Sequence, residues 1–369
     1  MKLKKKILFY FILVCFPLIS LFSLDFIVTK IFFPNNTNAI IEKKNEHRIS
    51  HHIFHHHLKP FVDIVEDHGK YGKHRLITNS LGFKDKEKRK IKPIINKKRV
   101  VIIGDSFTEG VLLKYEDTFA GMIDAELSKR NIETLNAGLS SYSPSIYFNK
   151  IKYLIEEEKL KFDELIIFLD ISDIWNEATT YTLKEDKVVK QKNMSFREWL
   201  SIFLNKNFFG TYLVTNLIYD KIKGGKNISQ DAFIDWSVSD DHPIDKWPIK
   251  KKFYEQFGVN GIKKVEIFMQ KIVNFNNKHN IQTTIVVYPW VSNIYYNDLD
   301  SMHVKIWKKF SKKNKINFLN LFPLFVEPNR NFKENKEIIK EYFIPFDIHY
   351  NRKGHRVIAK AFLDFYDNN

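Results

Sequence analysis

Three residues far apart in the chain have the types needed for nucleophilic catalysis. Ser106 follows Gly104 and Asp105, directly after a short run of apolar, β-branched residues. Asp347 and His349 lie two positions apart in PFDIHYNRKGH, just before an expected final helix. Side chains two apart in an extended segment project from the same side. A carboxylate beside an imidazole stabilises the imidazolium that forms when a serine is deprotonated. The sequence therefore offers a candidate serine nucleophile with a candidate base and an orienting carboxylate.

Hydrophobic periodicity indicates the elements that would position these residues. A buried strand is expected at 100–103, and apolar residues at helical spacing follow from Phe119 onward. A strand–turn–helix unit of this kind holds one residue at the carboxyl edge of a sheet, where open α/β folds bind ligands. Further strands are expected at 132–138, 162–173, 281–290 and 316–325. They alternate with amphipathic segments such as 143–157 and 352–367. This alternation predicts a parallel sheet with helices on both faces.

The N-terminal residues predict a membrane segment. Lysines precede a run from Ile7 to Leu24 that carries no charge and is just long enough to span a bilayer. A cleaved signal peptide is the alternative. No small-x-small cleavage site follows the run, and no small residue directly precedes Cys15 as in a lipoprotein signal. We therefore favour an uncleaved, single-pass helix in the cytoplasmic membrane. The positive-inside rule places Lys2–Lys6 in the cytoplasm and the chain after about residue 30 outside.

Charge and cysteine content exclude several classes of protein. The net charge is +16, but lysine is spread along the whole chain and no nucleic-acid-binding motif is present. Such a charge could attract anionic lipid or acidic glycan, whereas nucleic acid is not an expected partner of an exported protein. The single cysteine, Cys15, lies in the apolar segment. It excludes an intrachain disulfide and a cysteine-based metal site.

Composition divides the chain into segments. Residues 1–33 form the anchor or signal segment, and 34–96 form a juxtamembrane linker and N-terminal extension. Residues 97–366 form an α/β domain that is interrupted by an insertion at 178–250. The aromatic side chains of this helical insertion would form a lid or a sugar-binding wall above the sheet edge. The alternative is an ordinary packed helix with a surface loop.

A cluster of histidines lies in the N-terminal extension. Its members are His51, His52, His55, His56 and His57. Pairs four residues apart could bind zinc if the segment were helical. No carboxylate or cysteine lies within the cluster to complete such a site, so we expect no metal. We expect instead a solvated juxtamembrane segment or one that packs against the α/β domain.

Four blocks of sequence together resemble one known family. GDSFTEG, NAG at 136–138, DISD at 170–173 and DIHYNRKGH occur in the order and spacing found in the SGNH/GDSL hydrolases. The resemblance covers roughly residues 97–366, and TNSLGFKD at 78–85 is similar to a stretch often found before the GDS block in exported members. It implies a three-layer α/β/α fold of flavodoxin-like type.

The resemblance also implies roles for individual residues. Ser106 is the nucleophile, His349 is the general base and then the general acid, and Asp347 orients the histidine. The amide N–H groups of Ser106 and Gly138 form part of the oxyanion hole. These roles suit acyl transfer, because an ester carbonyl gains negative charge on attack and needs hydrogen-bond donors aimed at it.

This sequence departs from the family pattern in its third block. The position at which the family usually has an asparagine donor is occupied by Ser172, and Asn176 could substitute if a helix begins there. Loss of one oxyanion donor can cost roughly 100- to 1000-fold in rate.

The second departure concerns the orienting carboxylate. The family usually places it three residues before the histidine, where this chain has Phe346. Some glycan-modifying members of the family use the shorter spacing, so Asp347 remains the expected orienting carboxylate, and Asp173 is the alternative.

The resemblance therefore implies a membrane-anchored serine esterase or O-acyltransferase that needs no cofactor. The expected substrate is an acyl ester, an O-acetyl group in particular, on an envelope or exported polysaccharide, and the expected intermediate is acyl-Ser106. The alternative is a catalytically inactive relative that binds glycan or scaffolds an export complex. The sequence carries no indication of the oligomeric state.

Overall fold

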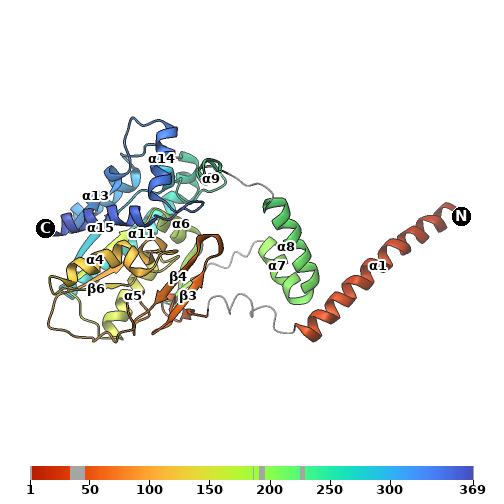
Figure 1. Ribbon diagram of the computed structural model, residues 1–369, viewed down its shortest axis with the longest axis horizontal. Coiled ribbons are helices and arrows are strands. Elements are labelled where there is room, and N and C mark those ends of the chain that lie inside the picture. Colours follow the sequence, from red (N-terminus) through yellow and green to blue (C-terminus); the bar gives the residue numbers. More distant parts are fainter. Residues whose placement is uncertain (1, 34–45, 186, 191–195, 225–228, 369) are drawn as a thin grey trace. The chain divides into compact units, whose positions relative to one another are not determined.

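The computed structural model describes the chain except for residues 1, 34–45, 186, 191–195, 225–228 and 369 (Figure 1). The chain forms two compact units. One comprises Met1–Glu46 and Lys192–Ile228, and the other comprises His47–Gln191 and Ser229–Asn369. Each unit is described separately.

The larger unit is built on a five-stranded parallel sheet with the strand order β11-β10-β7-β5-β6 (Figure 1). Its central strand β7 pairs in parallel with β5 on one side and with β10 on the other. Every residue of β5 and β7 is buried, as expected for strands covered on both faces. The strands, in chain order, are β5 (Arg99–Ile103), β6 (Glu133–Asn136), β7 (Glu164–Leu169), β10 (Gln282–Val287) and β11 (Asn317–Asn320).

Helices cover both faces of this sheet. Helix α4 (Phe119–Ser128) packs against α15 (Arg352–Asp367), and α5 (Pro144–Glu156) packs against α11 (Val259–Lys278). The sheet is thus the middle layer of the predicted α/β/α fold, which is confirmed. The remaining helices of this unit are α3 (Ser106–Glu109), α6 (Ser172–Trp175), α9 (Gln230–Ser237), α10 (Lys251–Phe253), α12 (Val291–Tyr295), α13 (Met302–Asn314) and α14 (Phe332–Tyr342).

The observed strands match the five predicted segments, and all but β5, which ends at Ile103 as predicted, end earlier than expected. The expected strand 162–173 ends at Leu169, because the acidic residues after it turn over the sheet edge into α6. The expected strand 316–325 likewise ends at Asn320, before the 3₁₀ turn Phe322–Leu324. These early endings place the polar residues of the motifs on loops at the carboxyl edge.

Three β-hairpins accompany the sheet in the same unit. They are β1–β2 (Arg48–His51 and His55–Leu58), β3–β4 (Asp63–Asp67 and Lys73–Ile77) and β8–β9 (Tyr181–Lys184 and Lys187–Lys190). The histidine cluster is therefore a hairpin, and the helical spacing considered for zinc does not occur. Of the two remaining expectations, the structure shows the cluster packed against the α/β domain.

The smaller unit consists of α1 (Lys2–Phe32), α7 (Phe196–Asn207) and α8 (Phe209–Gly224). Within α1, Phe9–Phe32 has a mean hydropathy of 2.5 and is long and apolar enough to cross a membrane or to act as a signal sequence. Both α7 and α8 pack against α1. The segment 178–250, expected as one insertion, therefore divides between the two units.

Candidate active site

The turn after β5 presents Ser106 at the carboxyl edge of the sheet. Asp105 caps α3 by accepting a hydrogen bond from the amide of Phe107 at 3.0 Å. Gly104 leaves no room for a larger residue, because a Cβ there would lie 2.1 Å from Thr108 Oγ1. The tight turn thus starts α3 at Ser106 itself.

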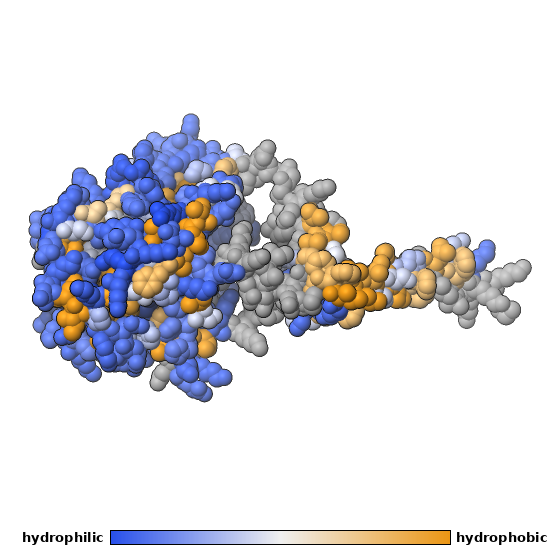
Figure 2. Space-filling view, turned by 60° about the horizontal axis from the view of Figure 1, so that its bottom comes forward, coloured by the Kyte–Doolittle hydropathy of each residue, from blue (hydrophilic) through white to orange (hydrophobic). Residues whose placement is uncertain are grey.

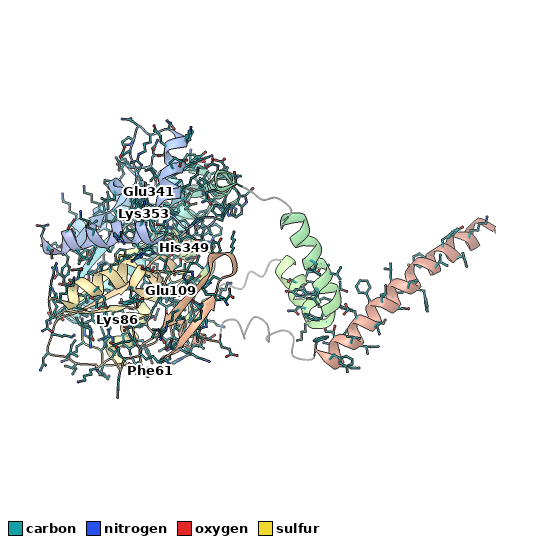
Figure 3. The ribbon with its side chains drawn as sticks, in the orientation of Figure 1. Phe61, Lys86, Glu109, Glu341, His349 and Lys353 are labelled. Carbon is teal, nitrogen blue, oxygen red and sulfur yellow. The ribbon has the colours of Figure 1, made fainter. Side chains whose placement is uncertain are left out.

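The C-terminal motif brings a histidine and a carboxylate to this serine. His349 Nε2 lies 2.8 Å from Ser106 Oγ, and His349 Nδ1 lies 2.6 Å from Asp347 Oδ1 (His349 is labelled in Figure 3). The backbone amide of His349 donates to the same carboxylate oxygen at 2.9 Å. With Nδ1–H donated to Asp347, Nε2 is free to accept the hydroxyl proton of Ser106. The structure therefore joins all three candidate catalytic side chains in one hydrogen-bonded chain.

The environment of Asp347 favours its ionised form. Partial burial would raise the pKa of this carboxyl, but the hydrogen bonds and charge of His349 lower the pKa below its usual value. An ionised Asp347 is what stabilises an imidazolium at His349.

The alternative orienting residue, Asp173, is engaged elsewhere. It is fully buried and accepts a hydrogen bond from the hydroxyl of Tyr147 and another from the amide of Asp170. Burial and the charges of neighbouring carboxylates raise its pKa well above the usual value. We conclude that Asp173 supports the loop after β7.

The predicted oxyanion donors differ in their availability. Ser106 is the first residue of α3, where an amide N–H has no acceptor within the helix. The amide of Gly138 donates to Asn136 Oδ1 at 3.1 Å. The amide and hydroxyl of Ser172 both hydrogen-bond to Asp170, and Asn176 follows at the end of α6. Of the three predicted donors Ser106, Gly138 and Ser172, only the Ser106 amide is thus not bonded to a neighbouring side chain among the described residues.

Three of the four motif blocks adjoin strands of the same sheet: GDSFTEG follows β5, NAG begins with the last residue of β6, and DISD follows β7. The fourth block, DIHYNRKGH, begins after α14 and runs into α15. The strands are parallel, so their carboxyl ends lie at one edge, and the hydrogen bond between His349 and Ser106 joins the fourth block to this edge. This arrangement is the α/β/α fold that the resemblance to the SGNH/GDSL hydrolases implies.

Solved structures similar to this chain include several esterases. The esterase EstA from Pseudoalteromonas sp. is 12% identical with a TM-score of 0.38, and the match covers 74% of this chain and 100% of that one. An acetylxylan esterase from Geobacillus stearothermophilus is 13% identical with a TM-score of 0.38, covering 74% and 95%. A lipolytic protein of the G-D-S-L family from Desulfitobacterium hafniense is 14% identical with a TM-score of 0.36, covering 72% and 97%. No protein-family model and no curated protein matches the sequence.

A buried ion pair that the sequence did not reveal lies close to Ser106 along the chain. Glu109, at the end of α3, forms a bidentate ion pair with Arg48 of β1, with oxygen–nitrogen distances of 2.5 and 3.2 Å (Glu109 is labelled in Figure 3). Its carboxylate also accepts from the amide of Ser140 at 2.8 Å. Burial would raise the pKa of Glu109, but Arg48, Lys84 and Ser140 lower it to about 2. Glu109 thus links hairpin β1–β2, α3 and the loop after β6.

Hairpin β1–β2, which carries the histidine cluster, also contacts the loop after β6. His56 Nε2 donates to the carbonyl of Ser140 at 2.8 Å, and its Nδ1 lies 2.8 Å from His55 Nδ1. The hydroxyl of Tyr142 donates to the carbonyl of His56 at 2.7 Å. Lys150, buried below, donates to the carbonyl of Ala137 at 3.1 Å. These contacts position the segment that carries Gly138.

Acidification is expected to destabilise this hairpin. Burial lowers the pKa of His51, His56 and His57 to about 4. The unfolded chain, with ordinary histidines near 6.5, binds more protons between these values, so stability falls as the pH drops from about 6.5 to about 4. Thermal unfolding followed by circular dichroism across this range tests the slope.

Two matched variants distinguish the contribution of a buried histidine to this pH dependence from that of an exposed one. His56→Gln should make the slope shallower, whereas His52→Gln, at an exposed position, should leave it unchanged. A midpoint that is constant from pH 7 to pH 4 would contradict the expectation.

Two further residues that the sequence did not reveal hold the loop that carries His349. Phe346 has a positive φ of 59°, which is strained for a residue with a bulky side chain. Its carbonyl accepts from the hydroxyl of Tyr71 at 2.5 Å, and its amide donates to Gln230 Oε1 at 3.0 Å. Tyr71 lies at the tip of hairpin β3–β4 and Gln230 begins α9. Both fix the residue directly before Asp347.

Removal of the Tyr71 hydroxyl is expected to slow catalysis without weakening substrate binding. Tyr71→Phe loses one hydrogen bond, worth about 1 kcal/mol, that holds the histidine loop in place. We expect kcat for p-nitrophenyl acetate to fall roughly fivefold to tenfold with KM nearly unchanged. Tyr153→Phe, which removes a hydroxyl bonded to Glu158 just after the end of α5, is the control. An unchanged kcat for Tyr71→Phe would show that the loop keeps its position without this bond.

Proposed function

We propose that this protein is a serine esterase that forms an acyl-Ser106 intermediate. The observation that carries the proposal is the chain of hydrogen bonds from Asp347 through His349 to Ser106, with distances of 2.6 and 2.8 Å. The nearby amide of Ser106 supplies an oxyanion donor. Nucleophile, base, orienting carboxylate and donor are the parts that acyl transfer requires.

The steps of the proposed reaction follow from this geometry. Ser106 Oγ attacks the ester carbonyl while His349 Nε2 takes its proton, and the Ser106 amide binds the resulting oxyanion. Collapse of this intermediate breaks the bond to the alcohol, which leaves with the proton from His349. Water, activated by His349, then attacks acyl-Ser106 and releases the acid. If a sugar hydroxyl replaces water in the last step, the same intermediate yields an O-acyltransferase.

The proposed substrate is an O-acetyl group on a polysaccharide. The resemblance to glycan-modifying SGNH/GDSL hydrolases implies this class, and the expected position outside the cytoplasmic membrane suits an envelope or exported glycan. Aromatic rings lie beside the catalytic loop and are of the kind that pack on sugar rings. Phe233 lies 6.0 Å from the ring of Phe346 and 5.6 Å from that of Trp236, which is half exposed.

We also propose that α1 is retained as a membrane anchor. Its last turns carry side chains that bond to α7 and α8, and a cleaved signal peptide would leave those partners without them. Asp25, for example, accepts from the amides of Gly210 and Thr211 at 2.9 and 2.8 Å. The molecular mass of the membrane-bound protein, measured by mass spectrometry, tests retention.

A fluorophosphonate probe tests the enzymatic proposal. The full chain in membranes should be labelled on Ser106, and the label should be lost in Ser106→Ala and strongly reduced in His349→Ala. An unlabelled wild-type chain would favour the inactive glycan-binding alternative. Labelling together with slow release of p-nitrophenol from p-nitrophenyl acetate that accelerates when acetyl-accepting oligosaccharides are added would identify the transferase.

A further inference from the structure

The helical hairpin α7–α8 is joined to α1 by polar contacts at one end of α1. The carboxylate of Asp25 accepts from the amides of Gly210 and Thr211, and from the hydroxyl of Thr211 at 2.7 Å. Thr29 Oγ1 accepts from the amide of Phe209 at 2.9 Å. These are the first amides of α8, which have no acceptor within their own helix. The end of α1 therefore caps α8.

Further contacts extend this junction to the link between α7 and α8. Lys30 Nζ donates to Asn207 Oδ1 at 2.9 Å. The ring of Phe208 lies 5.9 Å from that of Phe22 and 5.8 Å from that of Phe26. Polar and aromatic contacts together make α1, α7 and α8 one packed unit.

The position of this junction along α1 corresponds to one surface of a bilayer. A bilayer core takes about 20 helical residues. Counted from Ile7, directly after the lysines, such a span ends near residue 26. The side chains that contact α7 and α8 lie between Phe22 and Phe33, at the end of the span opposite the lysines. The hairpin therefore meets α1 where the helix leaves the lipid.

An apolar stripe on the hairpin remains exposed. Its members recur at helical spacing of three or four residues along each helix. They are Leu200 and Phe203 on α7, and Leu213, Val214 and Leu217 on α8, with exposed fractions of 36%, 39%, 44%, 54% and 63%. The exposed apolar side chains of α1 continue this surface within the same unit (Figure 2). A soluble surface rarely shows so many apolar side chains together.

We propose that α7–α8 is an interfacial hairpin whose apolar stripe inserts into the outer leaflet beside α1. This inference rests on the proposed membrane anchoring of α1. A bilayer is the occupant that fits, because the stripe adjoins the surface of a helix that is itself apolar enough to span one. An amphipathic helix at an interface buries its apolar face at the boundary between headgroups and acyl chains. The protein would thus hold the membrane by a span and a surface hairpin.

Spin labels in vesicles test this placement. Because the chain has a single cysteine, each label can be attached at one chosen position. The full chain is reconstituted in phosphatidylethanolamine–phosphatidylglycerol vesicles and labelled at Cys15, which reports on α1. In a Cys15→Ser background, Leu213→Cys and Leu217→Cys report on the stripe. Thr215→Cys is the matched control, since it is exposed on the same helix and lies about 160° around its axis from both leucines.

The accessibility of each label to oxygen, which dissolves in lipid, is compared with its accessibility to an aqueous nickel chelate. We expect the oxygen-to-nickel ratio at Leu213→Cys and Leu217→Cys to approach that at Cys15 and to exceed the ratio at Thr215→Cys severalfold. Nickel access at 213 and 217, with Cys15 in lipid, would overturn the proposal. If neither oxygen nor the nickel chelate reaches positions 213 and 217, the stripe contacts a protein partner, and the proposal is overturned as well.

The same preparation distinguishes this inference from the proposals it builds on. If Cys15 is itself open to nickel, α1 is not inserted, and both the anchor and the interfacial hairpin are wrong. Hydrolysis of p-nitrophenyl acetate by these vesicles depends on Ser106 alone among these features. Its presence or absence therefore reports on the esterase independently of the hairpin.

Discussion

Ser106→Ala and His349→Ala are each expected to reduce hydrolysis of p-nitrophenyl acetate by about 10³-fold or more. The first removes the attacking oxygen, and the second removes the base that accepts its proton at 2.8 Å. Residues that act as a unit are strongly non-additive. The double variant should therefore be no slower than either single variant. Steady-state rates of the detergent-solubilised full chain measure all three.

Controls of the same residue types make this result specific. Ser128→Ala lies on α4 and His279→Ala lies at the exposed end of α11, so both should keep the wild-type rate. A rate for Ser106→Ala that equals the wild-type rate would remove Ser106 from the mechanism. Loss in Ser106→Ala with full activity in His349→Ala would instead leave the nucleophile and reject the assigned base.

Glu109→Gln is expected to cause a large loss of stability. The exposed fraction of Glu109 is only 1%. The substitution removes its charge and leaves the guanidinium of Arg48 without its closest carboxylate. Breaking a buried ion pair on one side typically costs about 3–5 kcal/mol. We expect the midpoint of thermal unfolding, followed by circular dichroism, to fall by roughly 6 °C or more.

The effect of Glu109→Gln should depend on pH in a defined direction. The pKa of Glu109 is lowered to about 2 in the folded protein from 4.5. Its ionised form thus stabilises the fold above about pH 4.5, and this contribution is lost as the pH falls toward 2. The difference between wild type and variant should shrink over that range.

An exposed ion pair provides the control for this prediction. Asp63 pairs with Arg75 on hairpin β3–β4, where both side chains face solvent. Because water screens such pairs, Asp63→Asn should leave the unfolding midpoint unchanged. Equal midpoints for Glu109→Gln and the wild type would show that the buried pair does not contribute to the folded state.

Local sequence patterns predicted the parts of the site that are themselves local. The run 100–103 and the tight turn at Gly104 locate Ser106, and the close spacing of Asp347 and His349 locates the other two catalytic candidates. Parallel strands then bring these segments to one edge, because all their carboxyl ends point the same way. For this reason the sheet and the catalytic chain of hydrogen bonds could be anticipated together.

The supporting residues could not be anticipated, because their partners lie far away in the sequence. Arg48 precedes Glu109 by 61 positions, and Tyr71 precedes Phe346 by 275. Neither pair leaves a periodic pattern that a sequence could display. Glu109 did lie within GDSFTEG, so its place in the motif was the one available signal.

The histidine cluster shows a different limit. Spacing of four residues suits one face of a helix, but Phe54 and Leu58 also need burial, and the hairpin provides it. Side chains alternate between the two faces of a strand. Single-sequence periodicity does not distinguish these outcomes for so short a segment.

The hairpins before the sheet limit how this protein could be divided. A chain cut at residue 97 would keep Ser106, Asp347 and His349. It would lose the guanidinium of Arg48, the imidazole of His56 and the hydroxyl of Tyr71, which hold the loops on either side of the nucleophile. The shortest fragment that keeps these contacts therefore begins near His47, and transfer of this α/β domain to another protein would have to include both hairpins.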